Sequence, residues 1–204
     1  MNGTTLKFVA VLACAGLGSA CGEMSRQGRS PGQVIVNSLE AAAGGADEFS
    51  GFLQSDVITR VDEDDPTSCT VFNDSGRVTM SLMLKDPGTP TAPSEASSLN
   101  QVTFNRVRVE YRRTDGRNQP GVDVPYPFES AATFTVPESG QANAAFNLVR
   151  QTAKLEAPLM ALRRGAVLLS MIADVTFYGR DQAGNDVATA GSIGITFGDF
   201  GGGC

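Results

Sequence analysis

The strongest constraint on the fold is a period-two alternation of apolar residues near the C-terminus. Every odd-numbered residue over 167–177 is apolar, and the alternation returns over residues 193–197. Because successive side chains of a strand point to opposite faces, this pattern predicts two strands that each bury one face. The polar segment 181–186 between them contains Gly184 and Asn185, which favour the positive φ of a tight turn. We therefore expect a β-hairpin here.

Shorter runs with the same alternation occur upstream, separated by turn-forming residues. Further strands are expected over residues 52–61, 78–85, 102–111, 134–136 and 145–149. Within 102–111 the apolar phase slips, which predicts a β-bulge near Asn105 and Arg106. Seven or eight short strands at this spacing predict an all-β fold, an antiparallel β-sandwich over residues 49–200.

Two segments fit no strand pattern. Residues 34–43 are rich in alanine and end at two glycines, which favours either a short helix or a disordered tether. The folded domain is therefore expected to begin near Phe49. Residues 151–164 combine a helix-favouring stretch with Pro158, so both helix and loop remain open.

The first 21 residues have the features of an export signal. Lys7 precedes an apolar run over residues 8–17, which is short compared with the ~20 residues of a membrane-spanning helix. The segment Gly18-Ser19-Ala20-Cys21 resembles the lipobox of bacterial lipoproteins, in which the chain is cut before a cysteine that carries lipid. This resemblance implies a removed signal peptide over residues 1–20 and a lipidated Cys21. An ordinary secretory signal without lipid is the alternative.

A second cysteine competes for the lipid. Gly18 stands where the lipobox has an apolar residue, and Leu17 lies one position too early. Cys14 has an apolar residue in the right place, but the chain stays apolar after it, whereas it turns polar directly after Cys21. We therefore expect lipid at Cys21, with residues 21–48 as anchor and tether. The residue after Cys21 is not aspartate, which by the same resemblance favours the outer membrane.

Composition removes several kinds of chemistry. The chain has no histidine, which excludes Ser-His-Asp and Cys-His catalysis and most zinc sites. Its net charge of −6 opposes nucleic-acid binding, which depends on attraction to phosphates. It also lacks tryptophan, and therefore the best flat platform for sugars.

Five arginines gather in one stretch: Arg106, Arg108, Arg112, Arg113 and Arg117. We expect them to lie on the solvated face of strands; a patch for anions or lipid headgroups is the alternative. The following loop, residues 119–127, contains Tyr126 and precedes Phe128. A loop packed over a sheet edge is favoured there over a binding loop.

Two cysteines remain for the exported domain, Cys69 and Cys204. An oxidising compartment permits a disulfide between them, and two unpaired thiols are the alternative. The glycines before Cys204 predict a flexible tail over residues 201–204.

The densest acidic cluster includes Asp62, Asp64 and Asp65. Carboxylates on a loop suit Ca²⁺, although their spacing is not that of an EF-hand loop. A solvated turn is favoured over a calcium site. Asp181, Asn185 and Asp186 form a second oxygen-rich loop, for which turn formation is again favoured.

Residues 175–197 resemble the closing strands of bacterial immunoglobulin-like domains, which often contain Asp-x-Ala-Gly-Asn between a valine-rich strand and the last strand. Asp181, Ala183, Gly184 and Asn185 match this pattern. The resemblance implies an immunoglobulin-like sandwich that serves as an extracytoplasmic binding, adhesive or spacer module without catalysis. Neither the core tryptophan nor the cysteine pair of antibody domains can be placed.

The sequence therefore predicts a lipid-anchored protein of the bacterial cell envelope that acts as a non-catalytic binding or structural module. The membrane, through the N-terminal lipid, and an envelope protein or surface polymer are its expected partners. One alternative is a histidine-independent enzyme that uses two carboxylates on envelope polysaccharide. The other is a calcium-dependent adhesin.

Overall fold

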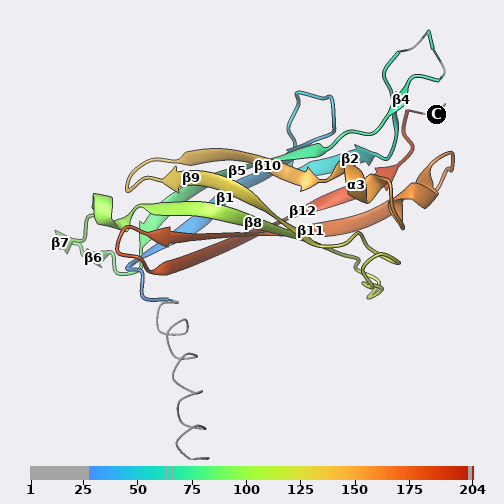
Figure 1. Ribbon diagram of the computed structural model, residues 1–204. Coiled ribbons are helices and arrows are strands. Elements are labelled where there is room, and N and C mark those ends of the chain that lie inside the picture. Colours follow the sequence, from blue (N-terminus) through green and yellow to red (C-terminus); the bar gives the residue numbers. More distant parts are fainter. Residues whose placement is uncertain (1–27, 63, 66, 202–203) are drawn as a thin grey trace, which may run out of the picture.

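Two β-sheets packed face to face make up the protein (Figure 1). The computed structural model describes residues 28–62, 64–65, 67–201 and 204. The two sheets contain eight strands, so the predicted all-β sandwich is confirmed. No helix in the described part of the chain is long and apolar enough to cross a membrane.

The smaller sheet has the order β1-β5-β10, with β1 Gly32–Ala42, β5 Asp74–Leu84 and β10 Ala142–Val149. The larger sheet has the order β2-β12-β11-β8-β9, with β2 Phe52–Asp56, β12 Asp186–Gly198, β11 Leu169–Asp181, β8 Val102–Arg112 and β9 Phe128–Val136. Neighbouring strands are antiparallel except β2 and β12, which run parallel.

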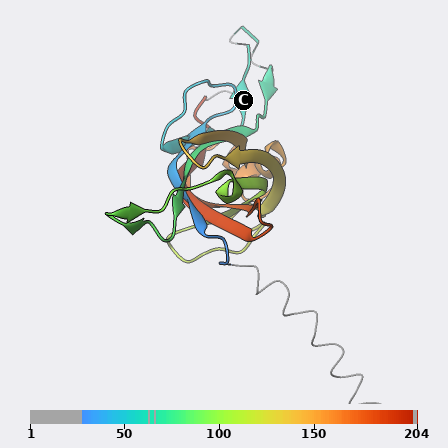
Figure 2. The same cartoon turned by 90° about the vertical axis from the view of Figure 1, so that its left-hand side faces the viewer.

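Short strands and helical turns lie at the two ends of the sandwich. The ribbon β3–β4 pairs Thr59–Arg60 with Cys69–Thr70, and the ribbon β6–β7 pairs Gly88–Thr89 with Ala92–Pro93. Figure 2 shows β6–β7 projecting from the side of the sandwich. The helical elements are η1 Ser98–Asn100, α3 Gln151–Lys154 and η2 Leu159–Leu162. Residues 151–164, for which the sequence left helix and loop open, therefore form one α-helical turn followed by a 3₁₀ turn.

The C-terminal hairpin forms as predicted. Strands β11 and β12 pair in unbroken register from Leu169↔Phe197 to Arg180↔Asp186. At the turn, Gly184 has a φ of +84°, and of the Gly184-Asn185 pair it is the residue with positive φ. Asn185 instead donates its backbone N–H to Asp181 Oδ1 at 2.8 Å.

The predicted bulge in β8 is also confirmed. The register between β8 and β9 shifts between Phe104 and Arg106, so that Phe104 and Val107 can both point into the core. On the other side of β8, the register with β11 shifts at Gly179. A Cβ atom at Gly179 would lie 2.4 Å from the carbonyl oxygen of Thr103, so glycine is required where the bulge brings the two backbones together.

Aromatic rings connect the two sheets through the core. The ring of Phe177 on β11 lies 5.3 Å from Phe146 on β10 and 6.2 Å from Phe104 on β8. The hydroxyl of Tyr111 on β8 donates to the carbonyl of Leu148 on β10 at 2.7 Å. Burial raises the pKa of Tyr111 far above its ordinary value, and the nearby charge of Asp74 raises it further. This phenol therefore stays protonated and keeps its bond between the sheets.

The expected helix or tether over residues 34–43 is wrong. These residues belong to β1, which pairs along its length with β5 and buries Val34 and Ala41. A bulge between Val36 and Ser38 interrupts the alternation, which hides the strand in the sequence. The folded domain therefore begins no later than Gly32, well before the expected start at Phe49, because packing against β5 outweighs the helix propensity of the alanines.

A disulfide joins Cys69 and Cys204, whose Cα atoms lie 5.9 Å apart. Of the two arrangements that the sequence left open, the structure has the bridge. The carbonyl oxygen of Cys204 also accepts a bond from Arg164 Nε at 2.9 Å. The expectation of a free tail over residues 201–204 is therefore wrong at its last residue, which is held covalently and by hydrogen bonding.

Replacing Cys69 and Cys204 together by serine should lower the free energy of unfolding by about 2–4 kcal/mol. The bridge spans 135 residues, so its loss frees a large part of the unfolded chain. Urea unfolding with and without dithiothreitol measures the effect: reductant should shift the midpoint of the wild type and leave that of the double variant unchanged. Equal wild-type midpoints in both buffers would contradict this expectation.

Candidate functional site

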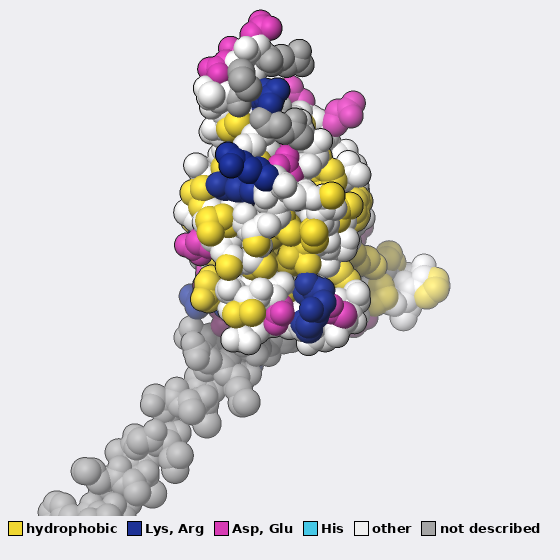
Figure 3. Space-filling view, turned by 90° about the vertical axis from the view of Figure 1, so that its right-hand side faces the viewer, with side chains coloured by type: hydrophobic (Ala, Val, Ile, Leu, Met, Phe, Trp, Pro, Cys, Tyr) yellow, Lys and Arg dark blue, Asp and Glu magenta, His cyan; other side chains and the backbone are white. Residues whose placement is uncertain are grey.

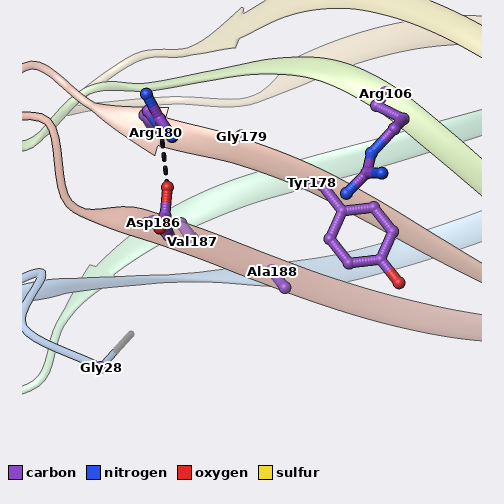
Figure 4. Close-up of a pocket in the computed structure, with 8 residues that line it drawn as sticks. All are labelled: Gly28, Arg106, Tyr178, Gly179, Arg180, Asp186, Val187 and Ala188. Carbon is purple, nitrogen blue, oxygen red and sulfur yellow. Dashed lines mark hydrogen bonds and ion pairs between the residues drawn. The ribbon is translucent and has the colours of Figure 1, made fainter. Parts of the chain in front are cut away.

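A hollow of about 550 Å³ lies beside the β11–β12 hairpin (Figure 4). Its lining residues come from β8, β11, β12 and the first described residue: Gly28, Arg106, Tyr178, Gly179, Arg180, Asp186, Val187 and Ala188. The guanidinium of Arg106 lies 4.3 Å from the ring centre of Tyr178, which is a cation–π contact. Arg180 Nε donates to Asp186 Oδ1 at 2.7 Å.

The charges of this hollow are already compensated. Arg106 also pairs with Glu129 at 3.1 Å, so both arginines have a carboxylate partner. Asp186 is the one carboxylate among the eight lining residues. Hydrolysis of a glycosidic bond without histidine needs two carboxylates about 5–9.5 Å apart across a cleft. The hollow therefore lacks the pair that the enzyme alternative requires.

The arginine cluster is likewise paired along the outer face of the larger sheet. Arg108 contacts Glu110 and Glu129, and Arg112 contacts Asp174, which also accepts a bond from Ser192. Hydrogen bonds from Arg113 and then Arg117 hold the pKa of Asp115 well below its ordinary value. With a carboxylate against each arginine, this surface favours the solvated strand face over an anion patch.

The acidic cluster near residue 62 forms local turns. Asp62 Oδ1 accepts the backbone N–H of Asp64 at 3.0 Å, and Asp65 Oδ1 accepts the N–H of Thr67 at 2.8 Å. In the described part of the chain, no three acidic or cysteine side chains converge as a metal site would require. The side chains of Asp62 and Asp65 thus stabilise local turns, which supports the interpretation of Asp62, Asp64 and Asp65 as a solvated turn; calcium binding stays the alternative.

The second oxygen-rich loop also uses its oxygens internally. Asp181 accepts bonds from both the backbone N–H and the side-chain amide of Asn185, each at 2.8 Å. Burial raises the pKa of Asp181, but these bonds and one from Ser30 outweigh it, so the pKa lies below its ordinary value. Asp186 is the partner of Arg180. The oxygen atoms of this loop therefore stabilise the hairpin turn.

The loop over residues 119–127 packs against neighbouring elements. Tyr126 covers Gly121, where an added Cβ would lie 2.4 Å from the phenol oxygen. A small hollow beside it is lined by Tyr126, Phe128, Arg150 and residues of α3. Arg150 lies 3.9 Å from the ring centre of Phe128 and donates to the carbonyl of Glu129. Tyr126 nevertheless remains 60 % exposed, so the loop is packed and also presents an aromatic surface.

An apolar surface covers the end of the sandwich that is on the right in Figure 1. Residues 113–127, 155–168 and the C-terminal residues meet at this end, and Figure 3 shows hydrophobic side chains gathered across it, with arginines near its margins. The exposed large hydrophobic residues of these segments are Val122, Tyr126, Leu155, Met160, Val167, Leu168 and Phe200. We call this set the distal apolar surface.

Local contacts hold part of the distal apolar surface in place. Leu168 and Phe200 meet over Gly198, where an added Cβ would lie 2.5 Å from Leu168 Cδ2. Arg164 has a φ of 59°, uncommon for a residue other than glycine. Its backbone N–H donates to Asp199 at 2.8 Å, which ties the 155–168 loop to the C-terminal segment. The backbone beside Leu168 and Phe200 is therefore held by these contacts.

A buried polar cluster, which the sequence did not reveal, joins four segments of the sandwich. Lys154 Nζ on α3 donates to Asp74 Oδ1 on β5 at 2.7 Å, and both side chains are at most 1 % exposed. Ser55 Oγ on β2 donates to Asp74 Oδ2 at 2.6 Å, and the N–H of Gly44 donates to Oδ1 at 2.9 Å. We call these four residues the Asp74 cluster.

No sequence signal marked these residues. Lys154 lies in the stretch 151–164, for which the sequence left helix and loop open, and Asp74 lies in Asn-Asp-Ser-Gly, whose residue types favour a turn. The two candidate lipidation sites, Cys21 and Cys14, lie outside the described residues.

Comparison with known proteins does not identify a family. Neither a scan of protein-family models nor a search of curated proteins finds a match for this chain.

Proposed function

We propose that the chain is an exported, lipid-anchored protein of the bacterial cell envelope whose sandwich is a non-catalytic binding or structural module. The Cys69–Cys204 disulfide is the observation that carries the proposal. Structural disulfides persist in oxidising compartments and are rare in the cytosol. The bridge therefore supports export independently of the signal-like N-terminus.

The strand order supports an immunoglobulin-like type of sandwich. Immunoglobulin domains place their first, second, fourth and fifth strands in one sheet and their third, sixth and seventh strands in the other. Here β1, β5 and β10 correspond to the first, second and fifth strands, and β8, β11 and β12 to the second group; the smaller sheet has no strand in the fourth place. β9 extends the second sheet beside β8, as the additional strands of variable-type domains do.

The distal apolar surface is the proposed binding surface. Gly28, the first described residue, lies beside Asp186 at the start of β12, whereas Leu168 and Phe200 lie beside Gly198 at the end of that strand. The distal apolar surface would therefore point away from an anchor attached through the N-terminus. Contiguous exposed apolar area often marks an interaction site, and Tyr, Met and Arg are enriched at protein interfaces. This chemistry favours an envelope protein over a surface polysaccharide as the partner.

Photo-crosslinking in cells tests the binding surface. A benzophenone amino acid at position 168 or 200 should give discrete crosslinked products. The same group at Met83, which is also exposed but lies on β5 of the smaller sheet, should give none. Equal crosslinking from all three positions, or none from 168 and 200, would contradict the assignment of the surface.

Replacing Cys21 by serine should abolish the incorporation of radiolabelled palmitate into the protein. Stable anchoring needs two or more lipid chains, and the substitution removes the sulfur that would carry lipid. The matched control is Cys14→Ser, which should incorporate palmitate as the wild type does. Loss of the label in Cys14→Ser together with a labelled Cys21→Ser protein would transfer the lipid site to Cys14.

A further inference from the structure

The methionines in the described part of the chain fall into two groups. Met80 and Met171 are buried in the core at 0 % and 4 % exposure, whereas Met83 and Met160 are 51 % and 52 % exposed. Met160 belongs to the distal apolar surface. We propose that Met160 is a reversible oxidation site, at which conversion to methionine sulfoxide weakens the binding of a partner, a regulation that rests on the binding function proposed for this surface.

The 3₁₀ turn η2 presents Met160 to solvent. Leu159 and Leu162 on the same turn are buried, so they fix η2 against the core. The backbone N–H of Met160 donates to the carbonyl oxygen of Glu156 at 2.8 Å, which holds the turn from its N-terminal side. An oxygen atom can therefore be added to the sulfur of Met160 without displacing a core side chain, whereas Met171 lies between the sheets and is protected.

The reaction takes a peroxide as oxidant. Cys69 and Cys204 are already joined, so no cysteine among the described residues offers a thiol that would react first. A lone pair on the methionine sulfur forms a bond to one oxygen of the peroxide, the O–O bond breaks, and the other oxygen leaves as water after proton transfer. Sulfur loses two electrons and the peroxide gains them. A methionine sulfoxide reductase with a dithiol donor reverses the change, releasing water and leaving a disulfide on the donor.

Oxidation changes the polarity of the distal apolar surface at one point. The flexible, apolar thioether of methionine adapts well to a partner surface, and methionine is enriched at protein interfaces. The sulfoxide is polar, so a partner that covers Met160 has to remove its oxygen from water, which is unfavourable without a matching donor. We expect the affinity for the partner to fall roughly tenfold.

Peptide mapping tests the modification itself. Hydrogen peroxide applied to the purified, folded protein should add one oxygen to residues 155–163, the tryptic peptide that contains Met160. Met83 should be modified to a similar extent, because it is equally exposed, whereas Met80 and Met171 should react only after the protein is denatured. A Met160 that stays unmodified in protein oxidised at Met83 would overturn the proposal.

Photo-crosslinking tests the consequence. The benzophenone amino acid at position 168 should give its product in untreated cells and severalfold less in cells exposed to hydrogen peroxide. Met160→Leu keeps the apolar volume but has no sulfur to oxidise, so its crosslinking should be the same with and without peroxide. The matched control is Met83→Leu, which removes an equally exposed sulfur outside the distal apolar surface. Peroxide should reduce crosslinking in this control as it does in the wild type.

The outcomes separate the regulation from the binding surface. Equal loss of crosslinking in Met160→Leu would overturn the proposal, because another oxidised group would then be responsible. Undiminished crosslinking of wild-type protein whose Met160 is shown by mass spectrometry to be oxidised would overturn it as well. No product from position 168 in untreated cells would instead contradict the binding surface, and the regulation would fall with it.

Discussion

Replacing Lys154 by methionine should lower the free energy of unfolding by about 3–5 kcal/mol. Asp74 is fully buried, and this lysine is the cation that contacts its carboxylate. Without the lysine, the remaining donors are Ser55 and the backbone of Gly44, which bring no compensating positive charge. Urea unfolding followed by circular dichroism measures the loss.

The matched control removes both charges. Replacing Asp74 by leucine in the Lys154→Met background should restore part of the lost stability, because no uncompensated charge then remains. Ser55→Ala alone should cost less, about 1–3 kcal/mol, since it removes one bond to a buried carboxylate. A Lys154→Met protein within 1 kcal/mol of wild type would contradict the role assigned to the Asp74 cluster.

Replacing Phe177 by alanine should cost about 3–5 kcal/mol. Its ring is fully buried and contacts Phe104, Phe134 and Phe146, so it joins β8 and β9 of its own sheet to β10 of the other. The truncation leaves a cavity that three neighbouring rings cannot readily fill. Phe177→Leu, which keeps most of the apolar volume, should cost clearly less.

The loss of stability in Phe177→Ala can be compared with the loss on replacing an exposed phenylalanine of the same protein. Phe52 is 47 % exposed at the edge of the larger sheet, and Phe52→Ala should cost much less than Phe177→Ala. Comparable losses for the two substitutions would mean that the core between the sheets is not centred on Phe177.

Strands with one clean buried face were predictable from the sequence. The alternation over 167–177 predicts β11, and the phase slip in 102–111 predicts the bulge at which Phe104 and Val107 both become buried. In these cases the local pattern and the tertiary packing agree, so period alone identifies the element.

The sequence did not predict the elements in which tertiary packing outweighs the local preference for helix or turn. β1 contains an alanine-rich end and a bulge between Val36 and Ser38, and both features conceal a strand whose partner β5 is distant in the sequence. The Asp74 cluster escaped notice for a related reason. Lysine and aspartate are almost always exposed, so no local pattern indicates that this pair meets inside the sandwich.

The sequence also did not decide whether the two cysteines form a disulfide or stay unpaired. Cys69 and Cys204 are 135 residues apart, and their approach depends on where the β3–β4 ribbon and the C-terminal segment leave the sandwich. The arginine cluster shows the opposite situation. Alternation along β8 directs Arg106, Arg108 and Arg112 to the outer face, where carboxylates of neighbouring strands meet them.

We propose that a lipid on Cys21 tethers this disulfide-bonded sandwich to the cell envelope. Mass spectrometry of the mature protein purified from membranes tests it most directly. We expect an N-terminal peptide that begins at Cys21 and carries a diacylglyceryl group on sulfur and an acyl chain on the amine. An unmodified N-terminus, or a lipidated N-terminus at Cys14, would contradict this.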